Sequence, residues 1–236
     1  QFEVRGDSPT ADPNQEWDLA IDLREVRAME FSPDGQVLAI ATGRREIEIW
    51  ATADWRRLHT LPLSRYSAAV NDLAFSTDGA RLLSVGERAE TTSAAIRMGT
   101  LPEVFLWNAD SWEMSHEIKL TDWSRTAQHA IFVGKVLAVV GNHAGQLTVI
   151  DTNTGGVAGE LEGHQNMIGD LAYDDRRNLL ISTSPEQTIV WDMESRSQAA
   201  TMPGSTFVAY APKTGLLATA FTRNENRCVL SRIASD

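Results

Sequence analysis

The sequence predicts an all-β fold built from five copies of one unit of about 40 residues. Short runs rich in Val, Ile, Leu and Trp alternate with Asp-Gly, Thr-Gly and Pro-containing turns, and no segment keeps a helical period over a dozen residues. Four strands of about 5–6 residues and four connections of about 4 residues account for a unit of this length. We therefore expect each unit to form a four-stranded antiparallel meander.

Two landmarks recur along the five units. The first is an aromatic residue at the end of the first strand, and the segment Val26–Gly35 returns 44 residues later as Val70–Gly79. The aromatic anchors are Phe31, Phe75, Phe132, Tyr173 and Tyr210. The second landmark is the third strand, which ends in Trp or an aliphatic residue. In the second unit an insertion, Gly86–Pro102, separates the two landmarks more widely.

A repeat of about 40–45 residues with four strands is typical of a propeller blade and not of a solenoid coil. Three phrases carry a resemblance to a known family: Phe-Ser-Pro-Asp-Gly at 31–35, Gly163-His164 and Trp191-Asp192. On these residues the chain resembles the WD40-repeat family over about residues 17–233. The resemblance implies a β-propeller that acts as a protein-interaction scaffold, as one domain or subunit of a larger signalling or assembly complex.

The strand order predicts how the ring closes. The outer, fourth strands are expected at Trp17–Leu23, Trp55–Leu61, Trp112–Leu120, Val157–Leu161 and Ser197–Met202. The first of these precedes every inner strand, and the last unit has no fourth strand after it. We therefore expect five four-stranded antiparallel blades, with Leu19–Ile21 paired beside Val229–Leu230 to close the last blade. The alternative is a partial ring of a larger seven-bladed propeller, because the family more often has seven blades.

Residues 1–16 are expected to be an N-terminal tail or linker, and residues 17–236 the WD40-like propeller. The tail is rich in Pro, Asp and Gly, so we interpret its Arg5-Gly6-Asp7 tripeptide as linker composition, with cell adhesion as the alternative. No secretory leader is visible in the sequence, so a cytoplasmic location is the default expectation. A processed secreted or periplasmic form is the alternative, because the chain starts at Gln1.

The composition excludes several functional classes. The formal net charge is −11, from 21 Lys and Arg against 32 Asp and Glu, and the sequence has no basic cluster. Nucleic acids and anionic membranes both require gathered basic charge, so we expect neither as a partner. No run approaches the roughly 18 apolar residues of a membrane-spanning helix, which predicts a soluble domain. The single cysteine, Cys228, excludes an intramolecular disulfide and a Cys-based zinc site.

No sequence pattern predicts a cofactor, a metal ion or a catalytic residue. The five histidines lack metal-ligand spacing, and the sequence contains no nucleotide-binding or serine-hydrolase motif. Asp151, Asn153, Gly156 and Glu162 match four positions of a calcium loop, but Gly155 removes one ligand and no helices flank the segment. We interpret these residues as a turn between two strands.

Two Trp-x4-Trp pairs, Trp50 with Trp55 and Trp107 with Trp112, are expected to fill the gaps between blades, with a sugar-stacking platform as the alternative. Trp191 is the corresponding third-strand tryptophan of the fourth unit. In the WD40 family a His before the first strand, an Asp between the second and third strands and this Trp form a hydrogen-bonded network. The resemblance implies such a network only in the fourth unit, from His164, Trp191 and Glu186 in place of the Asp.

One end of the ring is predicted to bind a partner. Because successive strands alternate in direction, the connections between second and third strands emerge at the same end as those leading from one blade to the next. These connections carry Arg65, Tyr66, Arg97, Met98, Trp123, Arg125 and His164. Arg, Tyr, Trp and Met are enriched in interface cores, and the arginines favour a protein or peptide segment with acidic or phosphorylated residues.

Two functions are therefore weighed. The first is a non-enzymatic interaction module, and the second is a propeller enzyme or small-ligand-binding protein with a site at the central channel. A channel site normally needs carboxylates or histidines at the inner strands. The inner strands start with pairs such as Val26-Arg27, Ala69-Val70 and Gln128-His129, which predict a mostly apolar and amide-lined channel. The interaction module is favoured.

Overall fold

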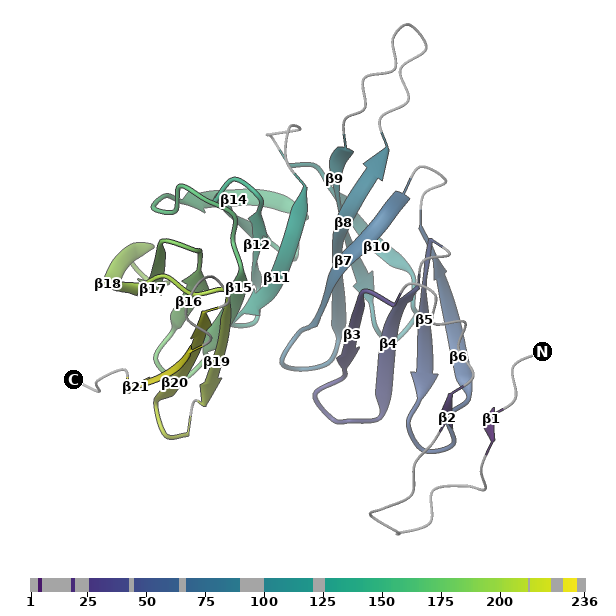
Figure 1. Ribbon diagram of the computed structural model, residues 1–236. Coiled ribbons are helices and arrows are strands. Elements are labelled where there is room, and N and C mark those ends of the chain that lie inside the picture. Colours follow the sequence, from purple (N-terminus) through teal and green to yellow (C-terminus); the bar gives the residue numbers. More distant parts are fainter. Residues whose placement is uncertain are drawn as a thin grey trace, which may run out of the picture.

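The fold consists of antiparallel β-sheets, which confirms the predicted all-β class (Figure 1). The computed structural model describes residues 4–5, 18–19, 26–42, 45–63, 67–89, 100–120, 126–211, 213–221 and 227–232. Every regular element in this part of the chain is a strand. It contains no helix with the length and apolar character needed to cross a lipid bilayer.

Five sheets follow one another along the chain, and the first four have four strands each. The first sheet is β3-β4-β5-β6, with bounds Ala28–Phe31, Val37–Thr42, Glu46–Ala51 and Arg57–Pro62. The second is β7-β8-β9-β10, with bounds Ser67–Phe75, Arg81–Ala89, Thr100–Asn108 and Met114–Ile118. The third is β11-β12-β13-β14, with bounds Ala127–Val133, Leu137–Asn142, Leu147–Asp151 and Gly156–Leu161.

The fourth sheet is β15-β16-β17-β18, with bounds Asp170–Asp174, Leu179–Thr183, Gln187–Asp192 and Ser197–Pro203. The fifth sheet is β19-β20-β21, with bounds Phe207–Ala211, Leu216–Phe221 and Arg227–Arg232, and it has three strands among the described residues. A separate pair is formed by β1, Val4–Arg5, and β2, Asp18–Leu19. The meander predicted for each unit is therefore the observed strand order.

The predicted closure of the last sheet is contradicted by the strand pairing. Asp18–Leu19 pairs with Val4–Arg5, so the N-terminal strand and β21 belong to different sheets. The local pair closes a loop of about 12 residues, whereas pairing with β21 would close one of more than 200, a difference in loop entropy worth about 2 kcal/mol. Figure 1 shows the β1-β2 pair beside the first sheet and β21 on the far side of the molecule. The alternative of a partial ring fits this arrangement.

The innermost strands of the five sheets contact one another in chain order, from β3 through β7, β11 and β15 to β19. Figure 1 shows these strands as an arc, with β3 and β19 standing apart at its two ends. Each pair of neighbouring sheets shares one apolar cluster, so the core is a series of layers between sheets. Trp107 and Trp191 lie in two of these layers and are at most 2% exposed.

The turn between the third and fourth strands repeats in detail. In four of the sheets this turn contains a residue with positive φ, five positions after the last core residue of the third strand. These residues are Trp55, Trp112, Gly155 and Arg196. The predicted turn at Asp151–Gly155 has this form, and Asp151 Oδ1 accepts the backbone N–H groups of Asn153 and Thr154 at 2.8 and 3.2 Å. The common backbone geometry supports a structural interpretation of the calcium-like pattern.

The insertion Gly86–Pro102 begins and ends in regular structure. Strands β8 and β9 continue into it and pair as far as Ala89 and Thr100, so both ends of the insertion extend the second sheet. Ladder hydrogen bonds satisfy the backbone there, which a plain loop would leave to solvent. Residues 90–99 lie outside the described part of the chain.

Candidate functional site

The predicted binding end is formed by the connections that leave β6, β8, β10, β12, β14 and β16. Arg65, Tyr66, Arg97, Met98, Trp123 and Arg125 lie outside the described residues, so their contribution to binding stays a prediction. His164 is described, and it is buried instead of facing solvent. Of these six connections, the ones described in full are those after β12, β14 and β16, which come from the third and fourth sheets.

His164 is held by two serines of the fourth sheet. Its Nε2 lies 2.6 Å from Ser182 Oγ and its Nδ1 lies 3.0 Å from Ser184 Oγ. Trp191 Nε1 donates to Ser182 Oγ at 2.8 Å, and the Ser184 hydroxyl donates to the carbonyl of Gln187 at 3.0 Å. These hydrogen bonds all run in one direction when the imidazole is neutral and carries its proton on Nδ1. Trp191 then donates to Ser182, Ser182 donates to His164 Nε2, and His164 Nδ1 donates to Ser184, so each polar group has a partner. The network fixes the connection that precedes β15.

Burial also sets the charge of this histidine. Desolvation lowers the pKa of His164 from 6.5 to about 4, which keeps the ring neutral at pH 7. The predicted role of Glu186 in this network is not observed. Its Oε1 accepts a hydrogen bond from Asn166 Nδ2 at 2.6 Å, while Ser184 contacts the imidazole. Burying a carboxylate beside the imidazole costs more free energy than burying a hydroxyl group, which explains why Ser184 and not Glu186 contacts the ring.

Two close approaches lock adjoining connections together at this end. Gly145, in the turn after β12, has φ +87, and a Cβ there would lie 2.6 Å from the carbonyl oxygen of Asn166. Gly163 sits so near the fourth sheet that a Cβ would lie 2.9 Å from the Trp191 ring. The third and fourth sheets thus present their connections as one packed surface.

The other sheets replace the His164 network with simpler contacts. In the second sheet Trp107 Nε1 donates to Ser84 Oγ at 3.0 Å, and Ser67 hydrogen-bonds to the carboxylate of Glu103. In the first sheet Trp50 Nε1 donates to Glu48 Oε2 at 3.0 Å, and Arg57 pairs with the other oxygen of Glu48 at 2.8 Å. Each tryptophan on a third strand is therefore anchored by its ring nitrogen.

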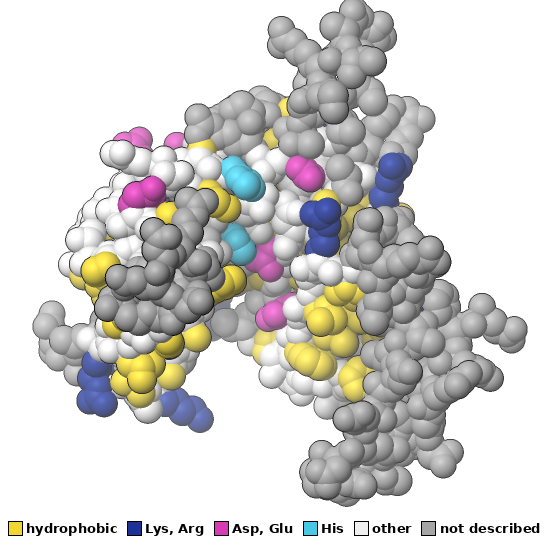
Figure 2. Space-filling view, viewed as in Figure 1, with side chains coloured by type: hydrophobic (Ala, Val, Ile, Leu, Met, Phe, Trp, Pro, Cys, Tyr) yellow, Lys and Arg dark blue, Asp and Glu magenta, His cyan; other side chains and the backbone are white. Residues whose placement is uncertain are grey.

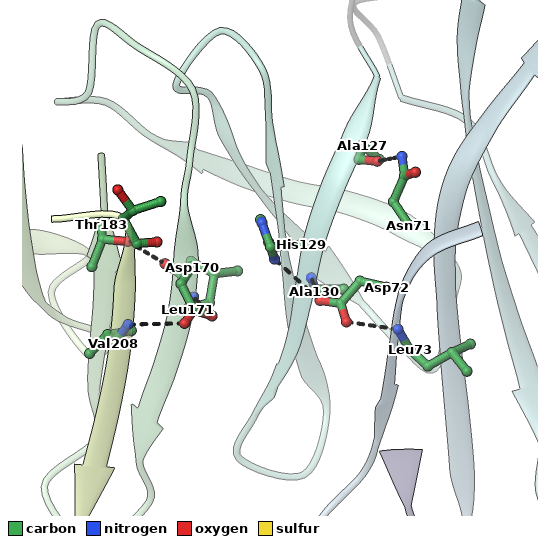
Figure 3. A network of polar contacts seen from close by, with 11 residues as sticks. Asn71, Asp72, Leu73, Ala127, His129, Ala130, Asp170, Leu171, Thr183 and Val208 are labelled. Carbon is green, nitrogen blue, oxygen red and sulfur yellow. Dashed lines mark hydrogen bonds and ion pairs between the residues drawn. The ribbon is translucent and has the colours of Figure 1, made fainter. Parts of the chain in front are cut away.

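The channel side of the inner strands carries carboxylates, which differs from the apolar and amide lining that the sequence predicts (Figure 3). Asp72 Oδ1 accepts the N–H of Leu73 at 2.9 Å, and Oδ2 accepts the N–H of Ala130 on the next sheet at 3.0 Å. Asp170 repeats the pattern with Leu171 at 2.8 Å and Val208 at 2.9 Å. Both aspartates lie three residues before the aromatic anchor of their strand. The predicted lining was based on the first two residues of each inner strand, which do not include this position.

A histidine and a third acidic residue complete this group. His129 Nδ1 lies 3.6 Å from Asp72 Oδ2, and Figure 2 shows acidic and histidine side chains in the hollow between the two halves of the arc. Burial raises the pKa of Asp170, opposed by its backbone hydrogen bonds, and burial followed by repulsion from Asp72 raises the pKa of Glu30. Within the described residues no group of three or more His, Cys, Asp or Glu side chains is placed to hold a metal ion.

The opposite end of the molecule has a pocket of about 350 Å³. Phe75, Ile131, Phe132 and Tyr173 line it, together with the polar side chains Thr77, Asp175 and Arg176. These residues lie at the end where inner strands finish, away from the predicted binding end. The pocket therefore combines aromatic and aliphatic side chains with a hydroxyl, a carboxylate and a guanidinium group, and this lining does not single out one ligand class.

The comparisons with known proteins give distant relatives. No protein-family model matches the chain. It is 25% identical over 175 residues to WD repeat-containing protein 90 of Mus musculus and 26% identical over 170 residues to apoptotic protease-activating factor 1 of Danio rerio. It is also 23% identical over 174 residues to eukaryotic translation initiation factor 3 subunit I of Aspergillus oryzae. These matches cover 72%, 72% and 69% of this chain.

A solved structure decides the fold. The chain matches one chain of a crystal structure of the mitotic checkpoint complex with a TM-score of 0.71 and 18% identity, over 87% of this chain. The fold is a WD40-like β-propeller. The chain spans 59% of that neighbour, and 9%, 12% and 48% of the three relatives in the order given above. Their assemblies and activities therefore concern much longer proteins.

Proposed function

We propose that this chain is a non-enzymatic WD40-type interaction module. It binds a protein or peptide segment at the end formed by the connections after β6, β8, β10, β12, β14 and β16. The contact residues in this proposal are Arg65, Tyr66, Arg97, Met98, Trp123 and Arg125. The observation that carries the proposal is the packed surface around Gly145 and Asn166, because connections held this closely lose little entropy when a partner binds.

The chemistry of the proposed contact residues suggests the partner. Arginine forks bind carboxylate and phosphate groups in two-point contacts, and Trp and Tyr add large contact areas at low entropic cost. In a chain of net charge −11, the proposed arginine contacts would select a segment that carries Asp, Glu or phosphate. The named relatives include proteins of multi-subunit complexes, which is consistent with a scaffold role.

The acidic side chains on the channel side of the inner strands favour this proposal over an enzymatic function. Each carboxylate of Asp72 and Asp170 accepts two backbone N–H groups, one of them from the neighbouring sheet. A carboxylate with both oxygens engaged in this way is stabilised as a structural link, whereas a general base needs a free oxygen directed at substrate. The group thus acts to join inner strands.

The experiment compares partner recovery by the wild-type chain and by the Trp123→Ala/Arg125→Ala double variant. Affinity capture from lysate of the source cells, before and after phosphatase treatment, is quantified by mass spectrometry. We expect the double variant to lose at least about 10-fold in recovery of specific partners, since interface Trp and Arg side chains contribute most. The matched control is Arg176→Ala, at the opposite end, which should recover them normally. Equal recovery of every partner by the double variant contradicts the proposal.

A further inference from the structure

The pocket of about 350 Å³ adjoins a second pocket, and the side chain of Phe75 lines both. The second pocket has a volume of about 240 Å³ and lies where turns of the first and second sheets meet. Thr77 lines the larger pocket and Asp78 the smaller one, so the turn from β7 to β8 separates them. We name the smaller one the acidic pocket and the larger one the aromatic pocket. Both lie at the end of the molecule opposite the proposed binding end.

Three carboxylates line the acidic pocket, those of Asp34, Asp78 and Asp110, and its lining contains no basic side chain. Asp34 and Asp78 come from equivalent turns of the first two sheets. In each turn Oδ1 accepts a serine hydroxyl at 2.6 Å and a backbone N–H at 3.0 Å. These bonds, the serine bond foremost, lower the pKa of both carboxyls, so both are ionised at neutral pH. Among the described residues no other side chain or backbone group donates to their Oδ2 atoms, which are open to a ligand.

Two aromatic rings complete the acidic pocket. Trp112 and Phe75 line it, and their rings meet edge to face, with 6.5 Å between centroids and 85° between planes. Both side chains pack against the apolar cluster between the first and second sheets, which fixes their positions. Aromatic faces attract cations, and carboxylates supply the opposite full charge. The acidic pocket therefore has the chemistry that binds the side chain of an arginine or a lysine.

The aromatic pocket has no such charge. Tyr173 donates its hydroxyl to Asn178 Oδ1 at 2.8 Å, so its ring is the part left to contact a ligand, next to Ile131. Asp175 and Arg176 are exposed and carry opposite charges, so together they add no net charge. This lining alone fits several kinds of ligand. Beside the acidic pocket, it can take an apolar side chain of the same ligand.

We propose that the two pockets together bind an extended peptide segment of a partner protein, through one basic and one large apolar side chain. The basic side chain enters the acidic pocket, between the carboxylates and the Trp112 ring. The apolar side chain enters the aromatic pocket beside Phe75 and Ile131. Side chains two or four residues apart in an extended peptide point the same way and are separated by about 7 or 13 Å. Because the pockets share one phenylalanine, one or three residues separate the two anchors.

Charge complementarity selects this ligand over others. Three carboxylates repel a nucleic acid or an acidic segment, and a neutral segment would desolvate them without compensation. In the part of the chain that the structure describes, no three acidic or histidine side chains are arranged to hold a metal ion, which favours a side-chain cation over an inorganic one. The ligand is opposite in charge to the one proposed for the other end, so either proposal can fail while the other stands.

The first test measures binding of the 236-residue chain to labelled, capped peptides by fluorescence anisotropy. The probes Leu-Ser-Arg-Ser-Leu and Leu-Ser-Gly-Ser-Arg-Ser-Gly-Ser-Leu place leucines two or four residues from the arginine on either side. We expect at least one to bind with a dissociation constant on the order of 100 µM, because the contact is small. Exchange of Arg for Gln, or of both Leu for Ser, should each weaken binding at least about 5-fold. Dissociation constants above about 1 mM for both probes, or unchanged binding after either exchange, overturn the proposal.

The second test locates the peptide. Asp34→Asn/Asp78→Asn removes two charges, and asparagine keeps the Oδ1 acceptor that each turn uses. This double variant should weaken binding of the peptide at least about 5-fold. The matched control, Glu160→Gln/Glu194→Gln, changes the net charge equally at exposed positions outside both pockets and should bind like the wild type. Equal weakening by the two double variants would reveal general attraction to an acidic chain and would overturn the site.

A third measurement separates the two ends of the molecule. Trp123→Ala/Arg125→Ala should bind the peptide like the wild type, since neither residue lines the two pockets. Loss of peptide binding in this variant would place the peptide at the other end and overturn the assignment.

Discussion

Asp170 joins the fourth and fifth sheets by accepting the backbone N–H of Val208 at 2.9 Å. Asp72 makes the same link to Ala130 between the second and third sheets, at 3.0 Å. Inner strands are sheet edges, whose outward N–H groups otherwise lack partners. The two aspartates are at equivalent positions of the repeat, so the propeller links neighbouring sheets by one recurring polar contact.

Removal of this link should destabilise the chain. Asp170→Ala leaves the N–H groups of Leu171 and Val208 without their acceptor, and we expect the free energy of unfolding to fall by about 1–3 kcal/mol. Urea denaturation measures the change. Asp175→Ala, at an exposed neighbouring position, is the matched control and should stay within about 0.5 kcal/mol of the wild type. Equal effects of the two substitutions would show that the link contributes nothing specific.

The serines beneath the two buried tryptophans should differ in importance. Ser182→Ala removes the partner of both Trp191 Nε1 and His164 Nε2, whereas Ser84→Ala removes only that of Trp107 Nε1. We expect losses of about 2–4 kcal/mol and about 1–2 kcal/mol, because each unsatisfied buried group adds its own cost. Thermal and urea unfolding of the two variants provide the comparison. A larger loss from Ser84→Ala would contradict the described network.

Acid should weaken the fold through His164. Its pKa is about 4 in the folded chain and 6.5 in the reference state, so only the unfolded chain binds this proton between those values. The contribution to stability is complete above pH 6.5 and declines as pH falls towards 4, by at most about 1.4 kcal/mol per pH unit. The raised pKa values of Glu30 and Asp170 act in the opposite direction. The difference between wild type and His164→Asn isolates the histidine.

We expect the wild type to lose more stability than His164→Asn between pH 6.5 and 4.5, measured by urea unfolding at several pH values. Parallel pH profiles for the two chains would place the histidine outside a desolvated site.

Two glycines with positive φ offer a test of the packed surface at the binding end. Gly145→Ala would place a Cβ 2.6 Å from the Asn166 carbonyl oxygen, whereas a Cβ at Gly35, φ +70, meets nothing within 4 Å. Left-handed backbone alone costs a non-glycine residue about 1–2 kcal/mol, so Gly35→Ala should show only that loss. Gly145→Ala should lose clearly more stability in denaturation experiments. Similar losses would mean that the connections after β12 and β14 are not in close contact.

Much of the fold is predictable from the sequence because local patterns specify it. The aromatic anchors and the third-strand tryptophans gave the meander and the series of five sheets, and Asp151–Gly155 gave a turn of the observed type. The N-terminal pairing was wrong, because counting strands does not weigh a local partner such as Val4–Arg5 against a distant one. The order of strands along the chain does not show which of the two pairing partners is energetically favoured.

The candidate site was less predictable, and the reason is specific. His164 and Trp191 are predictable because they match positions of a family motif. Ser182 is not a position of that motif, and only the pairing of strands β16 and β17 brings it beside them. Asp72 and Asp170 are linked to backbone groups of other units, which no motif records.

The central structural claim is that β21 is the edge strand of a three-stranded sheet among the described residues, with no fourth strand paired beside it. Residue-level hydrogen–deuterium exchange by NMR tests it directly. The account predicts that alternate β21 amides, those pointing away from β20, exchange rapidly, while the amides of β17, paired with β16 and β18, are protected along the strand. Uniform protection along β21 would mean that a fourth strand closes the sheet, and it would contradict that claim.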